Sequence, residues 1–136
     1  MRFIAFGDSG TASHYQHKVM AQMLTVPFDF VLHTGDVAYN TGTLAQLERG
    51  FFKVYAGITK SFAVTPIAGN HDYSTEGARP FREAFLLPEN GGEQGHERWF
   101  SFDWSQVHFV ALDTEVIGPE QAAWLDADLS ANQKPW

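Results

Sequence analysis

The feature that most constrains the fold of this chain occurs three times in its first 72 residues: a short apolar run, a glycine soon after it, and then polar residues. The runs are residues 2–6, 28–33 and 62–67, and the glycines are Gly7, Gly35 and Gly69. Short apolar runs bounded by glycine are typical of buried strands. We therefore expect three strands, each followed by a polar loop.

The segments between these runs have the periodicity of helices. Apolar residues recur at helical spacing over residues 13–24, behind Ser13 as a suitable N-cap, and again from Leu44 to Tyr55, before Gly57. Strands that alternate with helices favour a parallel sheet with right-handed crossovers. All three strand ends then lie at one edge of the sheet, where open α/β sheets bind their ligands.

The rest of the chain has a different pattern. Residues 98–104 and 107–112 are predicted to form a hairpin joined at Ser105-Gln106, and Pro119 is predicted to begin a last helix. The chain has 136 residues, of which 44% are hydrophobic and 15% aromatic, which is enough apolar material for one packed core. We therefore expect a single α/β domain.

Charge and composition narrow the classes of function. The formal charge of −7 argues against a surface that attracts nucleic acid. No apolar run approaches the roughly 20 residues that span a bilayer, and the first residues lack a signal-peptide pattern, so that we expect a soluble chain of undetermined compartment. The chain has no cysteine, so any metal must be bound by oxygen and imidazole ligands.

Polar residues that can bind metals follow all three predicted strands. Asp8 and Asp36 each directly follow a glycine, so that two carboxylates would project from neighbouring strand ends and one of them could bridge two ions. The third strand leads into residues 69–72, Gly-Asn-His-Asp. A single Gly-Asp turn is more often structural than functional, but three polar blocks at one sheet edge indicate a site.

In these three blocks the sequence resembles the calcineurin-like metallophosphoesterases, in which Gly-Asp, Gly-Asp-x-x and Gly-Asn-His-Asp/Glu follow successive strands in this order. Tyr39, three residues after Asp36, makes it similar to the purple acid phosphatases within that superfamily. Residues 30–36, 99–103 and 107–113 are also similar to the core strands of that family. The resemblance implies an α/β fold, namely the βαβαβ half of a two-sheet sandwich flanked by helices.

The resemblance also implies two metal ions that share one carboxylate. Asp8 and Tyr39 would bind Fe(III), and Asp36 would bridge it to the second metal. Asn70 would bind that second metal, a divalent Zn, Mn or Fe ion, through its amide oxygen. The chemistry agrees, because phenolate and carboxylate are hard anionic donors for a trivalent ion, whereas a neutral amide oxygen suits a divalent one.

Such a metal pair implies the hydrolysis of phosphomonoesters, with small phosphate esters as substrates. It clamps phosphate oxygens and lowers the pKa of bound water, so that a metal-bound hydroxide attacks phosphorus. By the same resemblance, His71 orients the phosphate and assists the leaving group, and Asp72 fixes the tautomer of His71. The expected enzyme is an acid-phosphatase-like metallophosphoesterase, and the resemblance permits a secreted or periplasmic location.

The metal-binding histidines of that family are missing from this chain. They come from a Val-x-x-His block and a Gly-His-x-His block that lie carboxy-terminal to the matched part, and residues 1–136 contain neither. We expect a calcineurin-like phosphoesterase domain, truncated on its carboxy-terminal side, that holds its metals weakly. An incomplete fold leaves an apolar sheet edge exposed, so that we also expect self-association.

The other histidines are weaker candidates. His14 and His17 are expected to face solvent, and His33 and His108 to be paired structural residues within strands. His96 lies in a glycine-rich loop, where contact with substrate or metal stays open. The aromatic residues of segment 99–104 are expected in the core rather than as a stacking platform for nucleic acid.

Two alternative functions stay open. The chain could be a non-catalytic fragment or remnant that keeps the scaffold for assembly or partner binding. It could also be a nucleotide phosphodiesterase, which has the same metal core and differs only in pocket loops that the sequence does not decode.

Overall fold

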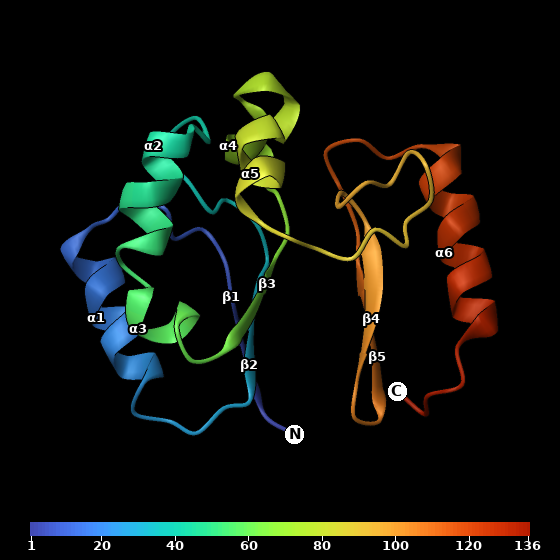
Figure 1. Ribbon diagram of the computed structural model, residues 1–136, viewed down its shortest axis with the longest axis horizontal. Helices are drawn as coiled ribbons and strands as arrows, with labels where there is room; N and C mark the ends of the chain where they lie inside the picture. The colour runs from blue at the N-terminus through green and yellow to red at the C-terminus, as the bar shows by residue number, and fades with distance from the viewer. The chain divides into compact units, whose positions relative to one another are not determined.

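The computed structural model describes all residues of the chain, 1–136, and divides into two compact units, Met1–Phe85 and Leu86–Trp136 (Figure 1). The first unit contains a three-stranded sheet and the second a two-stranded sheet. No helix in either unit combines the length and the apolar character that crossing a membrane requires. The mixture of a parallel sheet with helices confirms the predicted α/β class.

The sheet of the first unit is parallel, as predicted. Its strands are β1 (Phe3–Phe6), β2 (Phe30–His33) and β3 (Ala63–Pro66), in the spatial order β1-β2-β3. His33 at the end of β2 pairs with Phe6 on one side and with Pro66 on the other. The three strands therefore end in line at one edge, which brings the polar loops that follow them together.

The first helix confirms its predicted cap. Helix α1 (His14–Met23) begins after Ser13, whose side chain accepts a hydrogen bond from the backbone N–H of Gln16 at 3.2 Å. The helix follows β1 in the chain, and Figure 1 shows it on the same side of the sheet as α3. This connection carries the chain from β1 to β2 with the topology that the sequence indicates.

The second predicted helix, over residues 44–55, is not one continuous α-helix. It consists of α2 (Leu44–Leu47) and the π-helical segment η1 (Glu48–Phe52), and a further short helix, α3 (Ala56–Thr59), follows it. The wider π turn contains Gly50, where a Cβ atom would overlap the carbonyl oxygen of Gly10. Close packing of η1 on the loop after β1 thus accompanies the interruption, and hydrophobic periodicity alone does not reveal it.

Three short helical segments after β3 were not expected from the sequence. They are α4 (Asn70–Tyr73), the 3₁₀ segment η2 (Glu76–Ala78) and α5 (Arg79–Ala84). The last of them packs through aromatic rings: the ring centroids of Phe81 in α5 and Phe85 at its end lie 5.0 Å apart, and those of Phe85 and Phe51 in η1 lie 5.2 Å apart. The largest buried apolar side chains of this unit are Tyr55, Phe30, Phe51, Phe81, Leu47, Ile58, Val31 and Val37.

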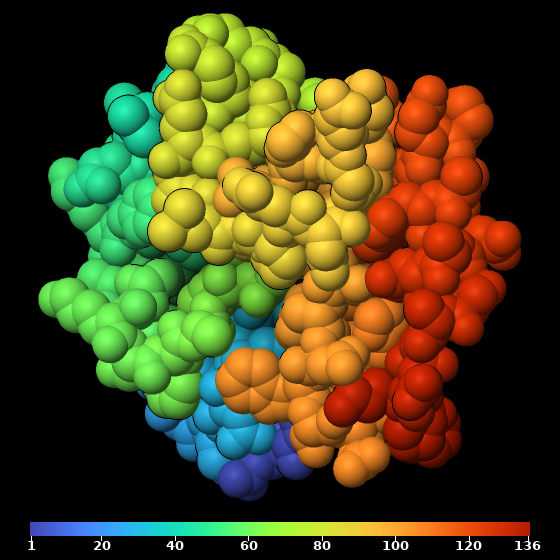
Figure 2. Space-filling model, turned by 45° about the vertical axis from the view of Figure 1, so that its right-hand side comes forward, coloured from blue at the N-terminus to red at the C-terminus, as the bar shows by residue number.

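The second unit consists of the predicted hairpin and final helix. Strands β4 (Phe100–Trp104) and β5 (Val107–Ala111) pair antiparallel, and α6 (Pro119–Ala131) begins at Pro119. Trp99 and Phe100 are buried, as expected for core residues. Most of α6 is exposed, and Figure 2 shows it, in red, as a continuous stretch of the surface.

Candidate metal centre

Backbone hydrogen bonds join the loops that follow β1 and β2. The N–H of Asp8 donates to the carbonyl of Gly35 at 3.1 Å, and the N–H of Tyr39 donates to the carbonyl of Gly10 at 3.2 Å. Asp8 and Asp36 both have positive φ angles, 53° and 56°, a conformation that is uncommon outside glycine. The two loops therefore hold their aspartates in matching, sparsely populated backbone conformations.

The carboxylates of these aspartates converge on one phenol. The hydroxyl of Tyr39 lies 2.8 Å from Oδ2 of Asp36 and 3.0 Å from Oδ1 of Asp8, and donates its proton to this pair. Burial, together with the hydrogen bonds to Asp36 and then Asp8, raises the pKa of Tyr39 far above its ordinary value. The structure thus brings together three of the four predicted metal ligands, with the carboxylates of Asp8 and Asp36 on either hydrogen bond of the Tyr39 hydroxyl.

The third block, residues 69–72, approaches Asp36 closely at Gly69. A Cβ atom at Gly69 would overlap Oδ1 of Asp36, so that only a residue without a side chain permits this approach. The backbone N–H of His71 then donates to the same Oδ1 at 3.0 Å. Asn70 is exposed at the start of α4, between these two residues. All three predicted blocks therefore meet around Asp36.

The imidazole of His71 packs beside the phenol of Tyr39, with ring centroids 4.3 Å apart. Its Nδ1 lies 2.7 Å from the carbonyl oxygen of Asn40, and must therefore carry the proton that this carbonyl accepts. In the neutral ring, Nε2 is then left as the acceptor. The backbone of Asn40 thus fixes the tautomer of His71, the task that we expected of Asp72.

Asp72 has different contacts from the ones we expected. Its side chain is fully buried and accepts hydrogen bonds from the backbone N–H groups of Val37, Ala38 and Gly69. Burial raises its pKa above the ordinary value, although these three bonds act in the opposite direction. The side chain lies under the loops rather than beside the imidazole of His71, because the backbone amides of both neighbouring loops surround it.

His33 is a paired structural residue, as predicted. It is buried, its Nε2 lies 2.8 Å from the hydroxyl of Ser9, and its Nδ1 accepts from the N–H of Gly35 at 3.4 Å. Burial lowers its pKa to about 4, although Asp36 acts to raise it, so the ring is neutral near neutral pH. The exposed positions of His14 and His17 also confirm the expectation for those residues.

Sequence reasoning missed the role of Gln16. This buried side chain accepts from the N–H of Ala12 at 2.6 Å and donates to the carbonyl of Gly50 at 2.6 Å. It thereby ties the loop that carries Asp8 to the π-helical segment η1. The available signal was a polar residue on the apolar face of an amphipathic helix. A glutamine buried there needs hydrogen-bond partners for both the oxygen and the nitrogen of its amide.

The donor set fits a metal centre in part. Two carboxylates, a phenol and the amide of Asn70 are oxygen ligands of the kind that hard cations prefer. No group of three or more histidine, aspartate, glutamate or cysteine side chains lies close enough together to hold a metal ion. The oxygen ligands are therefore present without the imidazole ligands that commonly complete such sites.

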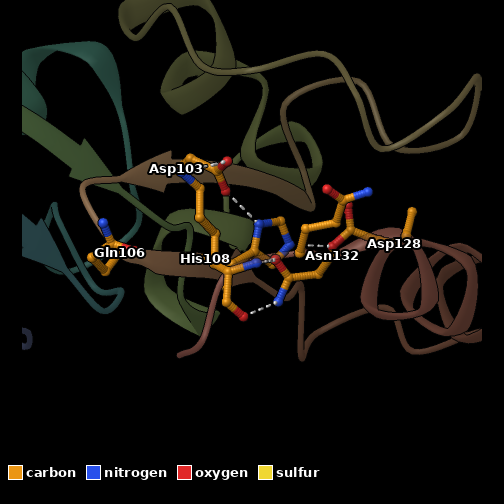
Figure 3. Close-up of a pocket in the computed structure, with 8 residues that line it drawn as sticks. Asp103, Gln106, His108, Asp128 and Asn132 are labelled. Atoms are coloured by element: carbon orange, nitrogen blue, oxygen red, sulfur yellow. Dashed lines mark hydrogen bonds and ion pairs between the residues drawn. The ribbon is translucent and has the colours of Figure 1, made fainter.

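A pocket in the second unit is a separate feature (Figure 3). His108 lies between Asp103 and Asp128, with Nδ1 2.8 Å from Asp103 and Nε2 2.7 Å from Asp128. Lys134 lies 3.6 Å from Asp103. His108 is thus paired on both nitrogens, as expected for a structural histidine.

Comparisons with known proteins agree with the geometry of the first unit. A family model described as "Calcineurin-like phosphoesterase" matches residues 1–134. Two curated relatives, both named "Acid phosphatase type 7", from Mus musculus and Homo sapiens, are 28% and 27% identical to the chain over 124 residues.

The aligned region covers 80% of this chain and 27% of each relative, so that the chain spans about a quarter of their length. No solved structure matches the chain. Because the family model extends over nearly all of its residues, the chain belongs to the calcineurin-like phosphoesterase family.

Proposed function

We propose that this chain carries the oxygen-ligand part of the metal centre of an acid-phosphatase-like phosphomonoesterase. One observation carries the proposal: the carboxylates of Asp8 and Asp36 both lie within 3.0 Å of the phenolic oxygen of Tyr39. Two carboxylates and a phenol gathered this closely are hard oxygen donors suited to a highly charged cation. The names of the two relatives support a phosphatase rather than another hydrolase.

The residues would divide between two metals. Asp8 and Tyr39 would hold Fe(III), and Asp36 would be shared with a divalent ion that Asn70 also holds. The metal pair, when bound, supplies Lewis-acid stabilisation of negative charge on phosphate oxygens and activates water. A dinuclear site and the choice of iron are parts of this proposal.

The contribution of His71 follows from its contacts. Its Nδ1 is occupied by the carbonyl of Asn40 and its ring is packed on Tyr39, so that Nε2 is the only nitrogen that can meet a substrate. When protonated, Nε2 donates a hydrogen bond to a phosphate oxygen or to the leaving group. We propose this role for His71, and small phosphate monoesters as the substrates.

Metal binding is the direct test, because it reports on the proposed ligands themselves. Calorimetric titration with manganese, zinc and iron should show binding that Asp36→Ala abolishes. The iron-loaded protein should have a visible phenolate-to-iron charge-transfer band that is absent in Tyr39→Phe. Absence of the band from an iron-loaded wild-type protein would contradict the assignment of Tyr39 as a ligand.

A second candidate function is a non-catalytic scaffold. The observation that favours it is the lack of any cluster of three histidine, aspartate or glutamate side chains close enough to hold a metal. The two candidates differ in their outcome with p-nitrophenyl phosphate. Hydrolysis above the Asp36→Ala control supports the phosphatase, whereas no hydrolysis together with no metal binding supports the scaffold.

A further inference from the structure

The buried carboxylate of Asp72 contacts the backbone of two different loops. Oδ2 accepts from the N–H of Val37 at 3.0 Å and from the N–H of Gly69 at 2.9 Å, and Oδ1 accepts from the N–H of Ala38 at 3.0 Å. Val37 and Ala38 connect Asp36 to Tyr39, whereas Gly69 directly precedes Asn70. One side chain therefore binds the backbone next to proposed ligands on both loops.

A second contact runs in the opposite direction between the same loops. Oδ1 of Asp36, on the loop after β2, accepts from the backbone N–H of His71, on the loop after β3, at 3.0 Å. Each loop thus contributes a carboxylate that binds the backbone of the other. Gly42, with a φ angle of 65°, packs against Asp72 so closely that a Cβ atom there would lie 2.5 Å from the Cα of Asp72.

The contacts require an aspartate at this position. Three N–H donors meet two oxygens, and both oxygens must accept. Asparagine would turn its NH₂ group toward at least one of these donors, leaving a buried donor without an acceptor. Glutamate keeps both acceptors but is longer by one methylene in a site with no exposed surface.

We propose that Asp72 is a positioning residue of the metal centre, whose carboxylate sets the spacing between Asp36 and Tyr39 on one loop and Asn70 on the other. The inference rests on the proposed function, since it concerns the ligands of that centre. It assigns Asp72 a role in arranging the ligands, distinct from the role of orienting His71. Side chains that orient metal ligands through hydrogen bonds, without binding the metal themselves, commonly change metal affinity about 10- to 100-fold when they are mutated.

The test compares Asp72→Asn with a control that destabilises the same unit elsewhere. Ile58→Ala removes a buried apolar side chain from α3, which makes no hydrogen bond to either loop. In the full chain, titrated with manganese and with zinc, Asp72→Asn should lower the affinity about 10-fold or more, whereas Ile58→Ala should leave it within about twofold of the wild type. Equal affinity of Asp72→Asn and the wild type overturns the inference.

A second measurement needs no metal. In amide NMR spectra of the metal-free chain, Asp72→Asn should shift the signals of Val37, Ala38 and Gly69, because these amides lose a charged acceptor. Unchanged signals would show that the contact is absent and would overturn the inference. If Asp72→Asn does not fold, Asp72→Glu replaces it in both measurements: both acceptors remain but lie one methylene farther from the backbone, so that wild-type affinity in Asp72→Glu also overturns the inference.

The outcomes separate this inference from the proposed function. If the wild-type chain binds neither metal, the proposed function fails, and the inference fails with it. If the wild type binds metal and Asp72→Asn binds it equally well, only the inference fails. A fall in affinity that Ile58→Ala reproduces to the same extent also overturns it, because general destabilisation is then sufficient.

Discussion

The imidazole of His108, in the second unit, lies between the carboxylates of Asp103 and Asp128. Its contribution to the free energy of unfolding, and the dependence of that contribution on pH, can both be predicted. His108→Leu removes the hydrogen bonds from the imidazole to Asp128 at 2.7 Å and to Asp103 at 2.8 Å. The side chain of Asp128 is only 16% exposed, whereas that of Asp103 is 51% exposed, so that solvent screens the second pair. The pair with Asp128 therefore dominates.

A hydrogen bond to a charged, mostly buried partner contributes about 1.5–3 kcal/mol. We expect His108→Leu to lower the free energy of unfolding by about 2 kcal/mol where the imidazole is charged. The remaining bond from the hydroxyl of Ser101 to Asp128, at 2.7 Å, limits the loss.

The sign of the pH dependence follows from the pKa of His108, which the hydrogen bonds to Asp128 and then Asp103 raise above 6.5. A raised pKa means that the charged ring contributes its full stabilisation below 6.5 and loses it as the pH rises through the raised value. The difference between wild type and His108→Leu should therefore be about 2 kcal/mol near pH 6 and clearly smaller near pH 9.

Urea unfolding followed by tryptophan fluorescence is the appropriate assay. All four tryptophans lie in the second unit, at positions 99, 104, 124 and 136, so that the signal reports on the unit that contains His108. The exposed His17 on α1 provides the control, and His17→Leu should leave the fluorescence transition unchanged. A difference between wild type and His108→Leu that is the same at both pH values would refute the reasoning.

Three further predictions concern the first unit. Gly69→Ala should lower stability by about 1–3 kcal/mol and weaken metal binding, because its Cβ atom would overlap the carboxylate of Asp36; wild-type melting and affinity would contradict this. Gln16→Ala should cost about 1–3 kcal/mol in chemical unfolding, since it leaves the N–H of Ala12 and the carbonyl of Gly50 without their partner, whereas Gln22→Ala on the exposed face of α1 should cost far less. We also propose that the chain self-associates through an edge strand of its three-stranded sheet, β1 or β3; light scattering that shows a monomer at all concentrations would count against it.

The parts of the fold that the sequence predicts are those specified by local patterns. Apolar runs bounded by glycine give the three parallel strands, and Ser13 and Pro119 fix the starts of α1 and α6. The convergence of Asp8, Asp36 and Tyr39 also follows from the sequence, because parallel strands in register end at one edge.

The parts that the sequence does not reveal depend on contacts between distant segments. The interruption at Gly50 accompanies its close approach to Gly10, 40 residues earlier in the chain. The contacts of Asp72 depend on amides 34 and 35 residues away. Hydrophobic periodicity and short motifs carry no information about such pairs, and the motif around His71 even suggested the wrong partner for Asp72.

The hydroxyl proton of Tyr39, which lies between two carboxylates, has a consequence for how the centre would load. Occupation by a cation would be an exchange reaction, because the ion takes the place of that proton and releases it to solvent. Acid would therefore act as a competitor for the site, and base would favour uptake. The hydrogen bonds from this hydroxyl to both carboxylates offset part of the repulsion between the two side chains.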